Sequence, residues 1–227
     1  MRLMDNEVLT FCADDAHGAP IMMKADELGI EPTEFIDEIN KNHQKSLAKF
    51  GIEYTNYHST HSKENEALVS EIYLDAKSSG YIYKKEIEQC FDKEKQMFLA
   101  DRYVIGECPK CSAKDQYGDG CEECGATYSA TELINPKSSL SGSKPITKIS
   151  EHIFFNLEKA KDDLVNFLDN SSIQKPILGK LSEWIDGDLK SWDISRDAPY
   201  FGFQIPDETK KYFYVWVDAP IGYMASA

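Results

Sequence analysis

Four cysteines between positions 108 and 124 are the residues of this sequence best suited to chemistry. Cys108 and Cys111 form one Cys-x-x-Cys pair, Cys121 and Cys124 form a second, and nine residues separate the pairs. Four soft thiolates at this spacing can close a tetrahedron around one zinc ion. They leave no coordination position open for a substrate, so the spacing predicts a structural zinc rather than a catalytic one.

The residues around the two pairs also favour a metal site. The intervening loop is rich in glycine and in residues that tolerate turns. Gly125, after the second pair, can adopt the positive φ that such a turn needs, whereas Ser112, after the first pair, adopts it less easily. Two disulfides are the competing interpretation. An acidic chain without a signal-peptide pattern is typical of the cytosol, where thiols stay reduced, and this favours zinc.

The composition sets the broad class of protein. The chain has 227 residues, enough for one large domain or two small ones, and 41% of them are hydrophobic, enough for a packed core. No apolar run approaches the length that spans a membrane. The formal net charge of −14 argues against a general nucleic-acid clamp, which needs a positive surface. We therefore expect a cytoplasmic protein with neither DNA nor a membrane as its partner.

The elements that would position the site are strands at both ends of the chain, with helices and the cysteine segment between them. This order indicates an α/β protein whose sheet is split by an insertion. Strands are expected at Val8–Cys12 and at Tyr212–Val217, the second being rich in aromatic and β-branched residues. Helices are expected from Pro32 onward and at Glu64–Lys77, Leu157–Leu168 and Pro176–Trp192, with a surface loop at Lys137–Pro145.

Five separated motifs occur in an order that is similar to a known family. They are Cys12-Ala-Asp-Asp-Ala-His-Gly18, Asn56-Tyr-His-Ser-Thr-His61, the double Cys-x-x-Cys, Trp192-Asp-Ile-Ser-Arg-Asp-Ala-Pro199 and Tyr214-Val-Trp-Val-Asp-Ala-Pro-Ile-Gly-Tyr223. Together they closely resemble the methionyl-tRNA synthetases of the bacterial type with one four-cysteine zinc knuckle. The resemblance covers essentially the whole chain, and the last two motifs are its most specific part.

The resemblance implies a class I aminoacyl-tRNA synthetase. Such an enzyme condenses methionine with ATP, together with Mg²⁺, to methionyl-adenylate and then esterifies methionine tRNA. It also implies a Rossmann-type parallel sheet split by a connective peptide that bears the zinc knuckle. On this basis we expect the first part of the catalytic domain at 1–79, the connective peptide at 80–198 with the knuckle at 106–126, and a return to the catalytic domain at 199–227.

The sequence departs from the family in one respect. Neither a His-Ile-Gly-His-type motif nor a Lys-Met-Ser-Lys-Ser-type motif occurs in it. Family chains carry a strand and the first motif before the segment that begins here, and they continue past its end. We therefore expect an internal portion of the enzyme that is inactive by itself. The alternative is a stand-alone zinc-ribbon binding module without catalysis, which leaves Asp15 and the segment from Trp216 to Tyr223 unexplained.

Two charged residues are candidates for catalysis. Asp15 lies just past the first expected strand, where a half-buried carboxylate needs a cationic partner such as an ammonium group. The resemblance implies that it binds the methionine amino group, while a helix N-cap is the alternative, for which Asp14 is at least as well suited. The resemblance implies that Arg196 supports methionine activation; a plain ion pair with Asp193 or Asp197 competes with that role.

The remaining candidates are aromatic residues and histidines. Trp216, Ala219, Pro220 and Tyr223 match the methionine pocket of the family, in which an aromatic wall contacts the polarisable thioether. A tyrosine hydroxyl can donate a weak hydrogen bond to that sulfur, which leucine or isoleucine could not accept. Without the resemblance, Trp216 and Tyr223 would be ordinary core aromatics. By the same resemblance we place His58 and His61 at the rim of the ATP site. We expect His17 and His152 to be structural.

Overall fold

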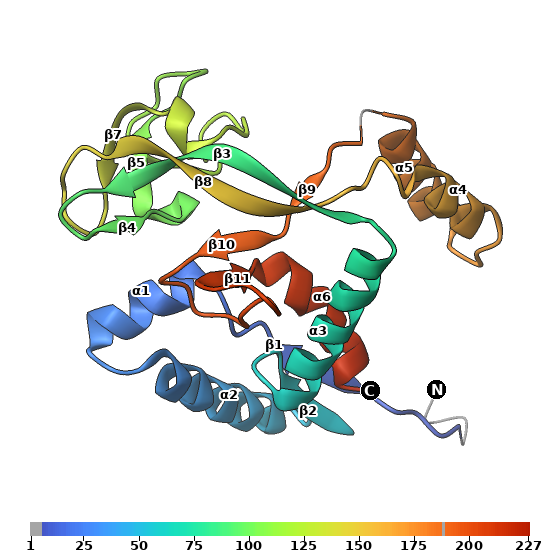
Figure 1. Ribbon diagram of the computed structural model, residues 1–227. Coiled ribbons are helices and arrows are strands. Elements are labelled where there is room, and N and C mark those ends of the chain that lie inside the picture. Colours follow the sequence, from blue (N-terminus) through green and yellow to red (C-terminus); the bar gives the residue numbers. More distant parts are fainter. Residues whose placement is uncertain (1–5, 188) are drawn as a thin grey trace.

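Parallel and antiparallel sheets alternate with helices in this chain. The computed structural model describes residues 6–187 and 189–227 (Figure 1). The helices are α1 (Ala19–Leu28), α2 (Pro32–Lys49), α3 (Lys63–Ser78), α4 (Lys161–Asp169), α5 (Lys175–Asp186) and α6 (Val215–Ala225), with short 3₁₀ turns η2 (Asp101–Tyr103) and η3 (Ala130–Glu132). The strands are β1 (Phe11–Asp14), β2 (Asn56–Ser59), β3 (Ile82–Asp92), β4 (Met97–Phe98), β5 (Val104–Glu107), β6 (Gln116–Tyr117), β7 (Ile134–Ser138), β8 (Ile146–Phe155), β9 (Trp192–Asp193), β10 (Ser195–Asp197) and β11 (Lys211–Phe213).

The lower half of Figure 1 contains a parallel strand pair and four of the helices. Strands β1 and β2 run parallel, with Asp14 opposite Ser59, and α1, α2, α3 and α6 lie around them. The pairing moves the first strand from the expected Val8–Cys12 to Phe11–Asp14, because the partner strand reaches only these residues. As a consequence Asp14 ends the strand and Asp15 follows it directly.

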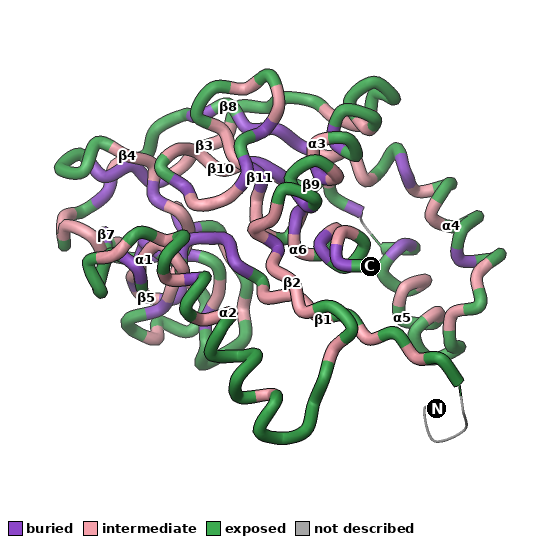
Figure 2. The backbone as a smooth tube through the Cα atoms, turned by 90° about the horizontal axis from the view of Figure 1, so that it is seen from below, coloured by how far each residue is buried: buried purple, intermediate pink, exposed green. Residues whose placement is uncertain are grey.

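The expected second and third helices are confirmed. Pro32 stands in the first turn of α2, where its missing N–H and fixed φ do no harm. Ser62 caps α3, since its side chain accepts a hydrogen bond from the Asn65 amide at 3.2 Å. Figure 2 shows that α2 lies mostly at the surface, whereas α3 is buried on the side that contains Val69 and Tyr73.

A long antiparallel ribbon of β3 and β8 connects the two halves of the molecule (Figure 1). Its register runs from Ile82 opposite Phe155 to Phe91 opposite Ile146. Strand β4 continues the sheet on one side and β9 on the other, in the order β4-β3-β8-β9. At its far end the ribbon lies beside the small β6-β5-β7 sheet, and the cysteine pairs follow β5 and β6 in the chain. The cysteine segment is therefore an insertion between the strands of the lower half.

The aromatic segment Tyr212–Val217 is not the long strand that its composition suggests. Strand β11 ends at Phe213, and the helix α6 begins at Val215. Phe213 is fully buried, and its amide donates to the Phe203 carbonyl at 2.8 Å, which completes the strand. The residues that follow are apolar on every side, so their pattern does not distinguish a strand from a helix.

The two later helices differ from their expected bounds. The second ends at Asp186, before Gly187, and not at Trp192, which instead pairs with Phe155 as part of β9. The helices α4 and α5 pack on each other through a small core of their own, with Leu168 and Ile185 at its centre, and project from the rest of the molecule in Figure 1. The expected loop at Lys137–Pro145 begins later than expected, because β7 continues to Ser138.

One of the two larger hydrophobic cores lies where the lower half meets the ribbon. It joins α3, β8 and β11 through Val69, Ile153 and Phe213. Figure 2 shows this buried belt at the centre of the molecule, with exposed backbone around it. Among the described residues, no helix is both long and apolar enough to cross a membrane.

Candidate functional site

The four cysteine side chains converge beside β5 and β6. Their Sγ atoms all lie within 4.8 Å of one another. Two of the distances are 3.8 Å, between Cys108 and Cys124, and 3.6 Å, between Cys111 and Cys121. Four sulfurs at about 2.3 Å from a tetrahedral zinc ion would lie about 3.8 Å apart. A disulfide needs about 2.05 Å, so the geometry fits a metal ion and not a pair of disulfides.

The two halves of the cysteine site have the same local structure. The Sγ of Cys108 accepts hydrogen bonds from the amides two and three positions later, at 3.3 and 3.5 Å, and the Sγ of Cys121 accepts one from three positions later, at 3.4 Å. Gly125 has a φ of 70°, as expected, and Ser112 a φ of 61°. Ser112 thus adopts the same conformation as Gly125, although serine does so less easily than glycine, because each amide donates to a cysteine carbonyl at 2.9 Å and holds the turn in both halves.

The loop between the cysteine pairs forms part of a cavity wall. The Gly118 amide donates to the Asp101 carbonyl at 3.1 Å. A Cβ at Gly118 would lie 2.7 Å from that oxygen and 2.6 Å from the Ala130 Cβ, so only glycine fits. The next residue, Asp119, forms an ion pair of 2.9 Å with Arg102. The metal-binding loop and η2 are thereby fixed against each other.

A cavity of about 370 Å³ brings together three of the candidate residues, Asp15, Arg196 and Trp216. They come from the end of β1, from β10 and from the start of α6. Their side chains therefore meet only in the folded chain. The other lining residues belong to the α1 turn, to η2 with the cysteine loop, and to the stretch before α6: His17, Gly18, Ala19, Pro20, Ala100, Asp101, Arg102, Asp119, Tyr200, Tyr214 and Val215.

Asp15 is an exposed residue whose carboxylate lies in an environment that does not favour its charge. Desolvation raises its pKa, the negative charge of Asp218 raises it further, and His17 partly opposes both. No ion pair links it to Arg196 within 6–187 and 189–227, the residues that the structure describes. A ligand with a positively charged group beside Asp15 would stabilise the ionised carboxylate and lower its pKa.

The N-cap alternative for the acidic pair is wrong. The helix α1 starts at Ala19 behind Gly18, whose φ is 103° and which provides no side-chain cap. The Asp14 carboxylate instead accepts hydrogen bonds from Asn40 and His43, both at 2.8 Å, and from the Tyr57 hydroxyl at 2.6 Å. Asp14 thus joins α2 to the β1–β2 pair and leaves Asp15 to face the cavity.

A buried chain of hydrogen bonds lies directly behind Asp15. The Nδ1 of His17 is 2.7 Å from the Asp218 Oδ2, and its Nε2 is 2.9 Å from the Nδ1 of His61. Asp218 and His17 have fully buried side chains, and the second carboxylate oxygen of Asp218 has no hydrogen-bond partner among the described residues. Burial raises the pKa of Asp218, and it lowers that of His61. The chain ties the β1–α1 turn to α6.

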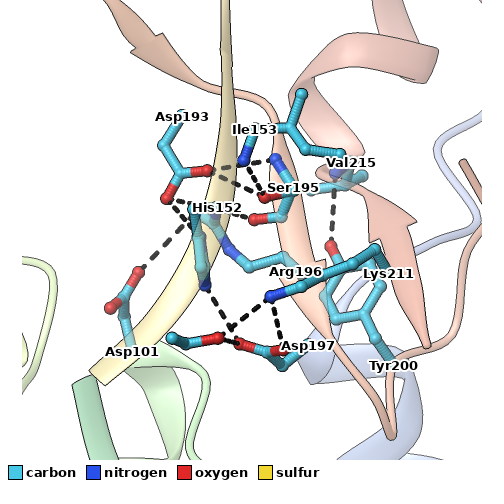
Figure 3. A network of polar contacts seen from close by, with 11 residues as sticks. Asp101, His152, Ile153, Asp193, Ser195, Arg196, Asp197, Tyr200, Lys211 and Val215 are labelled. Atoms are coloured by element: carbon cyan, nitrogen blue, oxygen red, sulfur yellow. Dashed lines mark hydrogen bonds and ion pairs between the residues drawn. The ribbon is translucent and has the colours of Figure 1, made fainter. Parts of the chain in front are cut away.

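The Arg196 guanidinium is held at the cavity by a ring contact, a backbone hydrogen bond and two long ion pairs (Figure 3). It lies over the Tyr214 ring, 3.8 Å from the centroid, and its Nη1 donates to the Ser195 carbonyl at 2.7 Å. The carboxylates of Asp193 and Asp101 are 3.6 and 3.9 Å away, beyond hydrogen-bonding distance. The ion pair with Asp193 that the alternative expected is therefore present, at a distance longer than a hydrogen bond.

The expected methionine-pocket residues lie on one face of α6. Trp216, Ala219, Pro220 and Tyr223 recur at i, i+3, i+4 and i+7, the spacing of a helical stripe. Trp216 is 60% exposed and Tyr223 is 74% exposed. Trp216 lines the cavity beside Asp15, whereas the other three lie further along the helix, outside its lining.

The two histidines expected at the ATP rim have different surroundings. His58, in β2, is 3.7 Å from the Glu64 carboxylate and does not line the Asp15 cavity. His61 stacks on Phe203 with an angle of 15° between the rings and contacts the cavity only through His17.

Sequence reasoning assigned no role to Arg102, Asp119 or Tyr214, all of which line the cavity. For Asp119 the sequence did contain a sign of this position, because the residue lies between the two cysteine pairs, in a loop that a bound metal would fix. His17 was expected to be structural, and it is buried between Asp218 and His61.

Comparisons with known proteins agree with this architecture. A sequence model of the family described as tRNA synthetases class I (M) matches residues 1–227. Two solved structures of methionyl-tRNA synthetase from Mycobacterium tuberculosis, one bound by methionyl-adenylate and one in complex with it, are similar to this chain with a TM-score of 0.69 at 16% identity. The match covers 100% of this chain and 40% of each of those chains, so this chain spans less than half of their length.

Proposed function

The chain belongs to the class I tRNA synthetases of group M, a family of ligases, and from this membership we propose that it is part of a cytoplasmic methionine–tRNA ligase. The reaction would activate methionine with ATP to methionyl-adenylate and transfer it to methionine tRNA. The likeness to the two synthetase structures, described with methionyl-adenylate, supports this substrate class.

The observation that carries the proposal is the single cavity shared by Asp15, Arg196 and Trp216. The Asp15 carboxylate would bind the methionine ammonium, which would supply the counter-charge that its present surroundings provide only weakly. Arg196, whose ion pairs with Asp193 and Asp101 are both longer than a hydrogen bond, would turn toward the negative charge that develops on the adenylate. Trp216 would contact the thioether, since sulfur makes favourable contacts with aromatic rings.

The rest of the amino-acid pocket would be the exposed stripe of α6. Ala219 and Pro220 would provide apolar contacts, and the Tyr223 hydroxyl would donate to the methionine sulfur. A stripe this exposed and this apolar suits a ligand or a neighbouring surface better than it suits water. His58 and His61 would lie at the rim of the ATP site, where ATP binds with Mg²⁺.

The cysteine cluster would hold one structural zinc ion. The four thiols are positioned for a metal, and the donor set of four cysteines is the one that zinc prefers in structural sites. We place the catalytic domain at 1–79 and 199–227, and the connective peptide at 80–198 with the knuckle at 106–126. The route of the chain supports these bounds, because it leaves the lower half through β3 and returns to it through β10.

Ligand binding by the zinc-loaded chain tests the proposal. Isothermal titration with a non-hydrolysable methionyl-adenylate analogue should give saturable binding, and the leucyl analogue should bind more weakly. Trp216→Ala should remove this preference. The matched control is Trp184→Ala, which removes an aromatic side chain of similar exposure on α5. Equal affinity for the two analogues, or equal effects of the two substitutions, would contradict the proposed methionine pocket.

A further inference from the structure

One fully buried histidine outside the cavity bonds to two carboxylates. His152, in β8, places its Nδ1 2.7 Å from the Asp193 Oδ2 and its Nε2 3.0 Å from the Asp197 Oδ2 (Figure 3). Its side chain is 0% exposed. An ionised carboxylate only accepts hydrogen bonds, so both ring nitrogens must carry a proton for both contacts to be favourable. The geometry is that of an imidazolium clamped between two anions.

The charges around the ring are consistent with this protonation state. Burial alone would lower the pKa of His152, but the hydrogen bonds to Asp193 and Asp197 outweigh it and the pKa is raised. Burial would likewise raise the pKa of Asp197, yet hydrogen bonds from its neighbours lower it. Charged groups face this cluster from each neighbouring element: Lys85 opposite in β3, Asp101 in η2, Asp193 in β9, Arg196 and Asp197 in β10, and Lys211 in β11.

The two carboxylates differ in their other partners. Asp197 also accepts from Lys211 at 2.6 Å and from the Ser150 hydroxyl at 2.7 Å, so it is fully engaged. The Asp193 Oδ1 accepts from the Ser195 amide at 3.1 Å and from the Ser195 hydroxyl at 3.3 Å, while its Oδ2 bonds to His152 and lies 3.6 Å from the Nη1 of Arg196. His152 and Arg196 therefore compete for one oxygen atom, and the imidazolium has the shorter contact.

We propose that His152 is a positioning residue for Arg196. By engaging Asp193, the imidazolium keeps the 3.6 Å ion pair between this carboxylate and Arg196 from closing to hydrogen-bonding distance, and the guanidinium stays at the Asp15 cavity. Without the imidazolium, Asp193 would lose its closest cationic partner, and the nearest available positive charge is Arg196. The guanidinium would then move onto Asp193 and away from the cavity. That Arg196 then helps to bind an adenylate rests on the proposed function, whereas the placement of Arg196 at the cavity does not.

The first experiment measures the accessibility of Arg196 without any ligand. Phenylglyoxal modifies arginine, and its rate at Arg196 is followed by peptide mass mapping of the zinc-loaded chain. His152→Gln should slow this modification at least about threefold, since a guanidinium paired with a carboxylate is shielded. The double variant His152→Gln with Asp193→Asn should restore the rate, because the competing carboxylate is gone. Lys180→Gln, which removes an exposed cation paired with Glu183, should leave the rate unchanged.

The second measurement reads the proton directly. In nitrogen-15 spectra of the histidine rings at pH 7, His152 should show both nitrogens protonated, and Asp193→Asn should remove the proton from one of them. If His152→Gln fails to fold, Asp193→Asn alone decides the question: it should leave the Arg196 modification rate equal or higher. A neutral His152 ring at pH 7, an unchanged rate in His152→Gln, or a slower rate in Asp193→Asn would overturn the proposal.

Titration with the methionyl-adenylate analogue separates this inference from the proposed function. If the wild-type chain binds the analogue, His152→Gln should weaken binding roughly tenfold and the double variant should recover most of it. Undiminished binding in His152→Gln would overturn the positioning role. If the wild-type chain does not bind, the proposed function fails, and the two measurements on Arg196 and His152 still decide the positioning role.

Discussion

At the scale of single residues, the cavity combines one uncompensated carboxylate with one loosely held cation. Asp15 faces the cavity with Asp218 behind it, and its pKa is raised by desolvation and by that neighbouring charge. Arg196 forms ion pairs with two carboxylates at 3.6 and 3.9 Å, both longer than a hydrogen bond. Within the part of the chain that the structure describes, neither Asp15 nor Arg196 therefore has a hydrogen-bonded partner of opposite charge. A zwitterionic or activated amino acid provides the opposite charges, and this complementarity supports a substrate site here.

Replacing Asp15 should damage ligand binding far more than folding. Asp15→Ala removes a charge-assisted hydrogen bond to an ammonium, which is worth on the order of 2–4 kcal/mol, or about 30- to 1000-fold in affinity or activation. Titration with the methionyl-adenylate analogue, together with thermal unfolding, measures both quantities. Glu27→Gln, at an exposed ion pair on α1, is the matched control. An unchanged affinity would remove Asp15 from the site.

The raised pKa of Asp15 gives a second prediction. Binding of an ammonium requires the ionised carboxylate, so affinity should fall as the pH is lowered through this pKa, and the fall should begin at a higher pH than the ordinary value of 3.8 implies. The ionised form is disfavoured in the folded state, so Asp15→Asn should leave stability at neutral pH unchanged or slightly higher. Titration of the analogue from pH 7 to pH 4 tests this. A pH profile that Asp15→Asn leaves unaltered would contradict it.

At the scale of elements, α6 has two faces with different tasks. Its exposed face carries the Trp216 to Tyr223 stripe, and its inner face packs on α3. There the buried Asn65 side chain donates to the Thr60 carbonyl at 2.8 Å and to the Asp218 carbonyl at 3.3 Å. The inner contacts fix the rotation of the helix, so they decide which residues reach the cavity.

The closest contact on the inner face is at Gly222. A Cβ there would lie 2.9 Å from the Thr60 Cγ2, so Gly222→Ala should destabilise the fold by about 1–3 kcal/mol through overpacking. A Cβ at Gly179, in α5, would meet no described atom within 4 Å, so Gly179→Ala should stabilise by up to about 1 kcal/mol through helix propensity. Urea unfolding of both variants measures the difference. Equal effects would show that α6 can shift away from Thr60 without loss.

The cysteine site was predicted accurately from the sequence. The secondary structure of the aromatic motif was not. The cysteine spacing reports a local geometry, which the structure reproduces with all four Sγ atoms within 4.8 Å. The run from Tyr212 to Val217 has a high β propensity, yet helix α6 begins at Val215 because tertiary contacts override propensity. The partnership of His152 with Asp193 joins residues 41 positions apart, and no spacing rule reports it.

At the scale of the whole molecule, the metal site and the cavity are mechanically connected. The chain between the cysteine pairs contacts η2 through Gly118, and Asp119 of the same loop lines the cavity. Loss of a metal would free this loop, because the small β6-β5-β7 sheet has few residues to hold it. An effect of the metal on ligand binding is therefore expected, although the four cysteines themselves lie outside the lining of the cavity.

The purified, reduced chain should contain one zinc ion, bound by Cys108, Cys111, Cys121 and Cys124. Structural zinc at such sites contributes roughly 10 kcal/mol or more of local folding free energy, so a strong chelator should unfold the loop while the β3–β8 ribbon persists. Metal analysis and hydrogen exchange of the 106–126 segment measure these effects. The Cys12→Ser variant is a suitable control, since this cysteine lies in β1. Metal-free reduced protein, or disulfides found by mass spectrometry, would contradict the prediction.

The last prediction concerns catalysis by residues 1–227 alone. Adenylate formation concentrates negative charge on the triphosphate, so it needs several cationic and hydrogen-bonding groups around it. The cavity contains the carboxylates of Asp15, Asp101 and Asp119 against two arginines, and one of these, Arg102, is already paired with Asp119 at 2.9 Å. Neither signature motif of the resembled family occurs in the sequence to add further groups.

Methionine-dependent ATP–pyrophosphate exchange by this chain should therefore be undetectable, even when the methionyl-adenylate analogue binds. In the proposed binding mode the cavity is suited to the amino-acid part of the substrate, because the ammonium of methionine would meet Asp15 whereas the triphosphate would meet a surface with more acids than free bases. The measurement compares the zinc-loaded chain with its Arg196→Ala variant at saturating methionine and ATP. Exchange in the wild-type chain well above that of Arg196→Ala would show that the cavity alone stabilises the transition state, and the assignment of this chain as an incomplete active site would be wrong.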